Sequence, residues 1–527
     1  MTIFSSKSLV SVTCRLLWSS TALISLACSS IRPNDDCPSN EVCRETFGPG
    51  YLCNDQGLCE PAAAEATCHD QYPDGLLQNP EKYKDYVVFG SLLADSGKEG
   101  ARQDAIILAI DSANRSLADL EANYPEIDGL RFGLVQCDHD GDRAEIARLG
   151  EYLVEKVGSP LLLGPASSAA SLATHELINF DENGNPESDA VIISPSATSV
   201  ALTSADTLQP GMLWRTAYMD DAQVYAMKAY ADATEKPYAV FYEDTAYGQG
   251  LFDGLKEISQ IPCVDCGVSF DAKTDNLEAV IRALVSIEGE RALEAAELVF
   301  FMGGQEGQIE AMMDQMLSLD SLRGKEVFFS DGAASGDSAN DASPGNFDRI
   351  LGSRIAAPPD TTAYRLFSAA FSAAYDTEPA LHSFTANAYD SAWLGIIAAL
   401  ENRLRNVPVR AQHLADALRH MSSSSWASIA EQECPGEFSA GECQAITLSA
   451  LEMEKIILGL KEFGEVNITG ASSALDYCKS DEELYRVNNA FELWRLEERE
   501  ANGDISAGYD IAPLSEQKVF IPQESCP

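Results

Sequence analysis

The hydrophobic positions of this chain alternate between short apolar runs and segments with helical spacing. Residues 86–93 (YVVFGSLL) form a run typical of a strand, and residues 105–113 (AIILAIDSA) then place apolar side chains at helical intervals. Similar strand-like runs recur at 131–137, 160–163, 191–193, 238–242, 298–301 and 327–329, with helical stretches such as 144–157 between them. This alternation predicts an α/β fold with parallel sheets covered by helices on both faces. About 430 residues take part, which is too many for one sheet, so we expect two lobes.

The first residues have the pattern of an export signal. Lys7 and Arg15 precede an apolar run at 16–27, which is too short to span a bilayer and suits the core of a signal peptide. We therefore expect residues 1–27 to be removed. Residues 25–28 (SLAC) resemble a bacterial lipobox, although Ser25 stands where Leu is commonest. Ordinary secretory cleavage after residue 27 is the alternative to acylation of Cys28, and we expect an exported, lipid-anchored protein at the periplasmic face.

The cysteines agree with an oxidising compartment. Of the 14 cysteines, 12 remain when Cys14 leaves with the signal and Cys28 is reserved for lipid, and an even number suits disulfides. Four of them fall between residues 37 and 59 and predict a small stapled module with three possible pairings, in a spacer at 28–80. Further expected pairs are Cys263 with Cys266, Cys434 with Cys443 and Cys478 with Cys526, while Cys137 is either paired or a free buried thiol.

The charge of the chain excludes several classes of partner. Asp and Glu number 82 against 36 Lys and Arg, which gives a formal net charge of -46. Such a protein repels nucleic acids and anionic lipid headgroups. The expected ligand is therefore a small molecule or a protein. A hydrophobic fraction of 45% is ordinary for a globular chain.

Two hydroxyl-rich loops follow neighbouring predicted strands. Residues 164–168 (GPASS) open a helix after the strand at 160–163, and residues 194–199 (SPSATS) follow the strand at 191–193. Ligands of open parallel sheets bind beyond the carboxyl ends of the strands, where helix N-termini favour anions. A simple helix cap explains the first loop alone. Together the two loops favour a carboxylate-binding shelf of hydroxyl and amide groups.

Several motifs, taken in order, resemble type I periplasmic solute-binding proteins of the leucine/isoleucine/valine-binding kind. The resemblance runs from about residue 85 to about residue 508 and rests on GPASS, ISPSATS (193–199), LWRTAYMDDAQ (213–223), AVFYEDTAYGQGL (239–251), FFMGG (300–304), ANAYDSAW (386–393) and ITGASSALDY (468–477). It implies two Rossmann-like lobes joined by three hinge crossovers, with the ligand enclosed between them. We assign 81–212 with 359–430 to lobe 1, and 213–358 with 431–527 to lobe 2.

The resemblance also implies which residues bind the ligand. Ser168 and Thr198, with the backbone of Ser196, would hold a carboxylate, and Asp331 would hold an ammonium where the amino-acid binders have Glu. The remaining expected contacts are Tyr247 in lobe 2, Phe384 in the side-chain pocket, and Gln305 where the family places an aromatic residue. Lys98 or Glu99 stands where an aromatic lid is usual. Because these positions differ from the family pattern, a polar amino acid or a related amide would also fit as the ligand.

No pattern in the chain predicts catalysis, a cofactor or a metal. His175 and Glu176 are followed by Asn179 where a zinc protease needs a second His, and there is no GxSxG sequence. Asp138, Asp140 and Asp142 have the composition of a calcium loop, but Gly141 comes too early for an EF-hand, so a solvated turn is expected. We therefore expect a solute-binding lipoprotein that delivers an amino acid or similar zwitterion to an ABC permease. The alternative is an envelope receptor that senses a ligand without a transporter.

Overall fold

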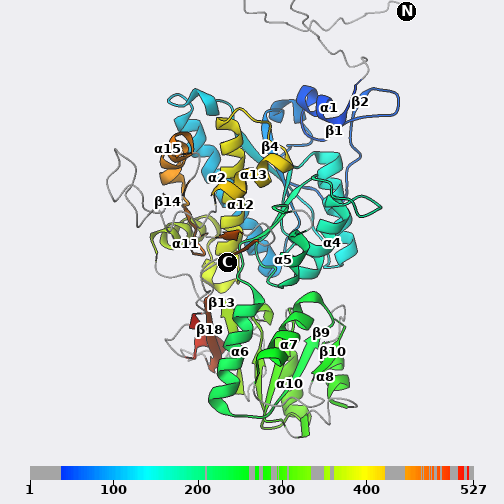
Figure 1. The fold of residues 1–527 in the computed structure, drawn as a ribbon, viewed down its shortest axis with the longest axis vertical. Helices are drawn as coiled ribbons and strands as arrows, with labels where there is room; N and C mark the ends of the chain where they lie inside the picture. Colours follow the sequence, from blue (N-terminus) through cyan, green and yellow to red (C-terminus); the bar gives the residue numbers. More distant parts are fainter. Residues whose placement is uncertain are drawn as a thin grey trace, which may run out of the picture.

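Two α/β lobes are stacked along the long axis of the molecule in the computed structural model (Figure 1). The structure describes residues 37–207, 210–259, 267–271, 277–286, 293–294, 296–304, 308–333, 349–355, 361–421, 446–463, 466, 468–473, 475, 477–479, 484–486, 490–498, 509–514 and 519–520. The two-lobe α/β fold expected from the hydrophobic pattern is confirmed.

Lobe 1 is built on a six-stranded sheet in the order β3-β5-β4-β6-β7-β8, in which only β3 is antiparallel to its neighbour. Apolar and β-branched residues dominate the parallel strands because helices cover both faces of the sheet. The strands are β3 (Asp70–Tyr72), β4 (Tyr86–Ser91), β5 (Arg131–Gln136), β6 (Leu161–Leu163), β7 (Val191–Ser194) and β8 (Leu213–Arg215).

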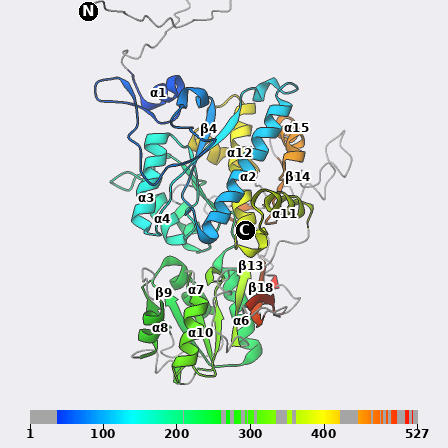
Figure 2. The ribbon, with the colours of Figure 1, turned by 180° about the vertical axis from the view of Figure 1, so that it is seen from behind.

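Helices α2 (Gly97–Leu120) and α12 (Thr385–Leu404) pack against each other in the larger core of lobe 1. Residues 385–402 of α12 are buried without interruption, which is why this helix has no polar face. Figure 2 shows α2 and α12 side by side, with α3 (Arg143–Glu151) and α4 (Ser168–Asn179) over another part of the lobe. The described residues of lobe 1 also form α5 (Ala201–Asp206), α11 (Thr362–Tyr375), α13 (Ala411–Met421) and α15 (Met453–Phe463).

Lobe 2 has an eight-stranded sheet in the order β10-β9-β11-β12-β13-β18-β19, with β20 also paired to β18. The first five strands are parallel, and β18 runs antiparallel to β13. The strands are β9 (Tyr238–Glu243), β10 (Gly267–Phe270), β11 (Leu298–Met302), β12 (Glu326–Phe329), β13 (Ile350–Ile355), β18 (Ala490–Glu498), β19 (Tyr509–Pro513) and β20 (Val519–Phe520). The helices are α6 (Asp220–Thr234), α7 (Ala246–Ile258), α8 (Leu277–Ser286) and α10 (Gln308–Ser318).

The chain passes between the lobes three times, but the boundaries differ from those expected. Strand β8 still pairs with β7 of lobe 1, so the first crossing follows residue 215 instead of preceding residue 213. The described part of 446–477, which we had assigned to lobe 2, contributes Leu448, Ile456, Ile468 and Tyr477 to the lobe 1 core. This stretch also holds β14 (Ile446–Thr447) and β15 (Ile468–Thr469), which pair with each other. The last crossing then leads through β16 (Tyr477–Lys479) and β17 (Leu484–Arg486) to β18.

The described part of the Cys-rich segment, residues 37–80, is part of lobe 1 rather than the spacer we expected. It forms α1 (Asn40–Phe47), β1 (Tyr51–Cys53), β2 (Cys59–Pro61) and the sheet strand β3, and is closed by Cys37–Cys53 and Cys43–Cys59 disulfides. A third disulfide joins Cys68 to Cys137 at the end of β5, so Cys137 is not a free thiol. Burial of Leu76 and Cys68 holds this segment on the lobe. Cys28, Cys263, Cys266, Cys434, Cys443 and Cys526 lie outside the described residues.

Candidate ligand-binding site

The first predicted loop lies where strand β6 ends. Gly164 has a φ of +92°, and a Cβ added there would lie 2.9 Å from the Leu92 carbonyl oxygen, so glycine is required at this turn. Ser167 caps α4, since its Oγ accepts a hydrogen bond from the Ala170 amide at 3.2 Å. Ser168 is the first residue of α4 and is 4% exposed. The expected turn from strand to helix therefore places Ser168 beyond the carboxyl end of β6.

The two hydroxyl-rich loops lie against each other. Ser168 Oγ accepts a hydrogen bond from the Ser199 amide at 3.2 Å. Ser196 Oγ donates to the Ala166 carbonyl at 2.9 Å, and Ser194 Oγ donates to the Pro165 carbonyl at 2.6 Å. The two loops that carry Ser168, Ser196 and Thr198 are thus joined by hydrogen bonds in lobe 1.

The acidic side of the site comes from lobe 2. Asp331 follows β12 at the start of the 3-10 turn η4 (Asp331–Ala333) and is 2% exposed. Tyr247 donates its phenol hydrogen to Asp331 Oδ1 at 2.5 Å and accepts from the Gly332 amide at 3.2 Å. Burial raises the pKa of Asp331, an effect that the Tyr247 hydrogen bond and the charge of Lys98 partly offset.

Direct contacts hold the two lobes together at this edge. Lys98, near the start of α2, donates from Nζ to the carbonyl oxygens of Gly304 at 3.0 Å and Gly332 at 3.2 Å in lobe 2. Ser199 Oγ donates to the Ala246 carbonyl at 2.9 Å. A Cβ on Gly332 would lie 2.6 Å from Gly304 Cα, so the two glycine loops that receive Lys98 pack tightly. Lys98 thus contacts both of these loops.

A second buried carboxyl group, Asp220, lies next to this arrangement. It begins α6 directly after the first crossing, and its amide donates to the Thr198 carbonyl at 3.0 Å. Asp220 is 2% exposed, and neither carboxyl oxygen has a hydrogen-bond partner among the described residues. The nearby Thr198 hydroxyl favours the ionised form of this carboxyl. Burial and the negative charge of Asp331 raise the pKa of Asp220 well above its usual value.

Arg102 adds a cation to the lobe 1 side of the site. It is 2% exposed, and its Nη1 donates to Ser196 Oγ at 3.1 Å while its Nε donates to the Ser383 carbonyl at 2.9 Å. The guanidinium carbon lies 5.1 Å from the centre of the Phe384 ring. Phe384 itself has a φ of +64°, a strained backbone conformation for a non-glycine residue, immediately before α12. Arg102 therefore links the serine shelf to the expected aromatic side of the pocket.

Sequence reasoning had selected six site residues that the structure describes. Contacts join Ser168, Ser196 and Thr198 within lobe 1 and Tyr247 with Asp331 in lobe 2, and Phe384 lies beside Arg102. Gln305 lies outside the described residues. The sequence analysis missed Asp220 and Arg102. Asp220 lies in the LWRTAYMDDAQ motif, whose two adjacent acids at a helix start were an available signal, whereas nothing local distinguishes Arg102.

Acids of the turn at 138–142, which has the composition of a calcium loop, accept hydrogen bonds from backbone amides. Asp142 caps α3 by accepting hydrogen bonds from the amides of Ala144 at 2.9 Å and Glu145 at 3.1 Å. Asp138 Oδ1 accepts from the Asp95 amide at 3.1 Å. In the part of the chain that the structure describes, the ligand atoms of these acids do not gather as a metal site requires.

A family model described as periplasmic binding protein matches residues 89–430, which is more than half of the chain. The chain belongs to the periplasmic binding protein family. The resemblance to type I solute-binding proteins of the leucine/isoleucine/valine-binding kind is thereby confirmed. No curated protein matches the sequence of this binding protein.

Solved structures share the fold of this binding protein at low sequence identity. LivJ of Streptococcus pneumoniae, a branched-chain amino acid transporter substrate-binding protein solved with isoleucine, is 18% identical, with a TM-score of 0.51 over 81% of this chain and 99% of its own. A type 1 periplasmic binding protein of Bordetella pertussis is 16% identical, with a TM-score of 0.55 over 82% and 100%. An R. palustris ABC transporter solute-binding protein solved with 4-hydroxybenzoate is 13% identical, with a TM-score of 0.50 over 81% and 97%.

These similar structures are solute-binding proteins, and their ligands include both an amino acid and an aromatic acid. Proteins of this family bind small solutes and are exported. Among the residues described here, no helix combines the length and apolar character needed to cross a membrane.

Proposed function

We propose that this protein captures an amino acid or a similar small zwitterion between its lobes and delivers it to an ABC permease. The observation that carries this proposal is the pair of buried carboxyl groups, Asp220 and Asp331, of which Asp220 has no well-formed hydrogen bond to its side chain among the described residues. A buried carboxylate without a partner is costly, and an ammonium group supplies both charge and hydrogen. A ligand with a cationic group therefore suits this site better than a simple carboxylic acid.

In this proposal, each of the other site residues binds one part of the ligand. The shelf of Ser168, Ser196 and Thr198 lies at a helix N-terminus and would hold the ligand carboxylate, with Arg102 behind Ser196. Asp331, oriented by Tyr247, and Asp220 would receive the ammonium. Phe384 would line the side-chain pocket, and Gln305 would contribute from lobe 2. Charges bound from both lobes would stabilise the closed form.

Calorimetry on the purified mature protein tests this arrangement. The ligand is first identified by native mass spectrometry and a thermal-shift screen of amino acids and aromatic acids, since a ligand that binds the folded state raises the melting temperature. Asp331→Ala should then cost about 3–5 kcal/mol of binding energy. Ser168→Ala should cost about 1–3 kcal/mol because backbone amides remain. Asp140→Asn, which removes an exposed aspartate charge of lobe 1 away from these residues, is the control. Unchanged affinity in Asp331→Ala, or selection of benzoate-type acids alone, would contradict the proposal.

We further propose that Cys28 is the lipidated N-terminus of the mature protein. The support is the short apolar run that ends at residue 27 and the folded Cys-rich module that begins soon after it. Stable anchoring requires more than one acyl chain, as in bacterial lipoproteins. Cys28→Ala should move the protein from the membrane fraction to the soluble fraction. Equal membrane recovery of the two forms would exclude the anchor without affecting the ligand assignment.

A further inference from the structure

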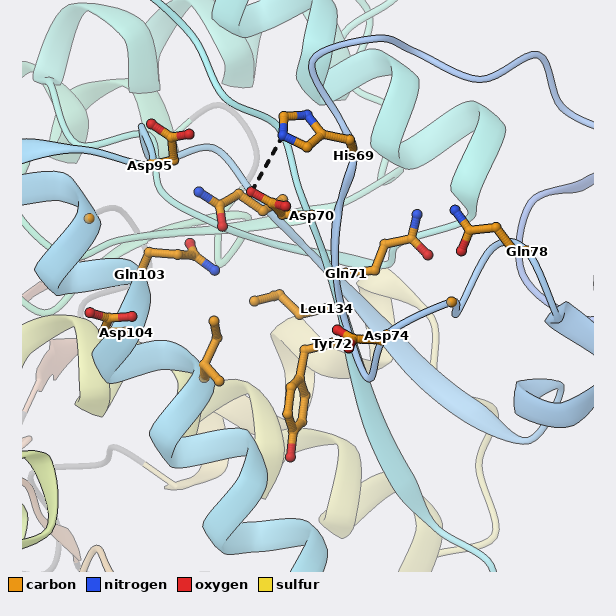
Figure 3. Close-up of a pocket in the computed structure, with 14 residues that line it drawn as sticks. His69, Asp70, Gln71, Tyr72, Asp74, Gln78, Asp95, Gln103, Asp104 and Leu134 are labelled. Carbon is orange, nitrogen blue, oxygen red and sulfur yellow. Dashed lines mark ion pairs between the residues drawn. The ribbon is translucent and has the colours of Figure 1, made fainter. Parts of the chain in front are cut away.

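A pocket of about 580 Å³ opens on lobe 1, between the start of α2 and the edge strand β3 (Figure 3). Its walls come from residues 69–78 of the Cys-rich segment, from residues 95–107 and from the end of β5. The cleft residues described above do not line it. Because β3 belongs to the Cys-rich segment, the pocket exists only where that segment has joined the sheet. It is therefore separate from the site between the lobes.

The lining of this pocket is strongly acidic. Four aspartates line it, and no lysine or arginine does; they are Asp70, Asp74, Asp95 and Asp104. The only basic candidate is His69, whose Nε2 lies 3.7 Å from Asp70 Oδ2 while both side chains are more than half exposed. Burial raises the pKa of Asp104 to about 6, so this carboxyl is ionised at neutral pH and is partly desolvated. The pocket therefore attracts cations.

A buried amide in the pocket wall lacks a partner. Gln103 is 4% exposed, and its Oε1 accepts a short hydrogen bond of 2.5 Å from Ser91 Oγ. Its Nε2 has no acceptor among the described residues. Figure 3 shows this nitrogen directed into the space between Asp70, Asp104 and Leu134. A buried donor nearly always has an acceptor in folded proteins. An acceptor atom of a ligand in the pocket would form the hydrogen bond that Gln103 Nε2 lacks.

The spacing of the acids argues against a metal ion. In the part of the chain that the structure describes, the only group of three or more His, Cys, Asp or Glu ligand atoms within 4.8 Å of one another consists of Cys37, Cys43 and Cys53, which form disulfides. A small divalent ion needs several oxygen ligands within about 2.6 Å, and these aspartates are too dispersed to supply them. Dispersed charges suit an organic cation that spans several ångströms.

Apolar side chains complete the lining between the charges. Tyr72, Ile107 and Leu134 contribute to it, and Tyr72 is held by its hydroxyl, which donates to Asp111 Oδ1 at 2.6 Å. Methylene groups pack favourably on such a surface while ammonium groups at either end reach carboxylates. We propose that this pocket binds a small organic dication that also bears a hydroxyl or carbonyl oxygen, with the oxygen accepting a hydrogen bond from Gln103.

Two matched probes test the proposal by calorimetry on the full mature protein at low salt. 1,3-diamino-2-propanol has two ammonium groups and a hydroxyl, and 1,3-diaminopropane lacks only the hydroxyl. The wild-type protein should bind both, the first more tightly. Asp104→Asn should weaken both by about 10-fold or more, as expected for a lost charge-assisted hydrogen bond. Gln103→Met should abolish the difference between the two probes.

Control variants test whether the two probes bind in this pocket. Asp140→Asn removes an exposed charge of lobe 1 outside the pocket and should leave both affinities within about 2-fold. Asp331→Asn alters the cleft and should not affect these probes, which separates this inference from the function proposed above. Asp70→Asn, at a side chain that is 55% exposed, keeps the test valid if Gln103→Met fails to fold, and it should also weaken binding. Absence of saturable binding to the wild-type protein, or loss of binding in Asp331→Asn with retention in Asp104→Asn, would overturn the proposal.

Discussion

His175 is a buried histidine whose titration should be visible in the stability of the whole protein. It lies in α4 at 2% exposure, its Nδ1 accepts from Asn179 Nδ2 at 3.1 Å, and its ring packs edge-on against Phe180. Burial lowers its pKa to about 4 from a usual value of 6.5. As the pH falls below 6.5, His175 becomes protonated in the unfolded chain, whereas in the folded protein it stays neutral until about pH 4.

We therefore expect the free energy of unfolding to fall between pH 6.5 and pH 4. The contribution of His175 should be about 2 kcal/mol at pH 5. Urea unfolding of the wild-type protein and of His175→Gln at pH 7.5 and pH 5.0 measures it, because the difference between the two proteins cancels the titration of other groups. A difference that does not change with pH would show that His175 is accessible to protons in the folded protein.

At this scale the residues that the resemblance singles out lie in loops that the hydrophobic pattern also predicts. Ser168, Thr198 and Asp331 each lie in the loop after a predicted strand, where a parallel sheet presents its ligand-binding loops. Arg102 could not be selected in this way. It lies in the middle of the second turn of a long helix, and only the tertiary contacts with Ser196 and Ser383, far away in the chain, distinguish it from a surface arginine.

At the scale of helices and strands, α12 holds residues 470–472, a segment near the end of the sequence, against lobe 1. Asp390 of α12 is fully buried, and its carboxyl oxygens accept from the Ala471 amide at 2.7 Å, the Ser472 amide at 2.8 Å and Ser472 Oγ at 2.6 Å. The backbone at Gly470 approaches so closely that a Cβ there would lie 2.2 Å from Asp390 Oδ2. These contacts join residues 470–472 to the core helix.

Asp390→Ala should therefore destabilise the protein by about 3 kcal/mol or more, since it leaves two buried amides without an acceptor. Asp390→Asn should cost less because one acceptor oxygen remains. Asp416→Ala, at an exposed position of α13, removes the same carboxyl group without these contacts and should change stability by less than about 0.5 kcal/mol. Chemical denaturation measures all three, and equal midpoints for Asp390→Ala and Asp416→Ala would contradict this role.

Seven strands, all in the parallel parts of the two sheets, were predictable because apolar runs are strong local signals. The strands that were missed include very short ones, ones whose partners lie far away in the chain, and the six-residue strand β13. Strands β14 and β15 have only two residues each, and β3 forms by pairing with β5, 60 or so residues away. The pairing of Cys68 with Cys137 was likewise inaccessible, since cysteine spacing does not determine connectivity.

In the whole molecule, Lys98 is the clearest determinant of how far the lobes close. It belongs to lobe 1, yet its ammonium group donates to the Gly304 and Gly332 carbonyls of lobe 2, and its charge partly offsets the rise that burial causes in the pKa of Asp331. Hydrogen bonds from a charged group contribute about 1.5–3 kcal/mol each when well formed. Loss of this contact should therefore shift the ligand-free protein toward open forms by roughly 10-fold or more.

Small-angle X-ray scattering of the ligand-free protein tests this expectation. Lys98→Met keeps a side chain of similar length without the charge, and it should increase the radius of gyration because the open population grows. Lys236→Met is the matched control, because Lys236 pairs with Glu326 Oε1 at 2.6 Å entirely within lobe 2 and should leave the scattering unchanged. Identical profiles for Lys98→Met and the wild-type protein would mean that closure rests on other contacts, such as the hydrogen bond from Ser199 to the Ala246 carbonyl. In that case Ser199→Ala should produce the larger radius instead.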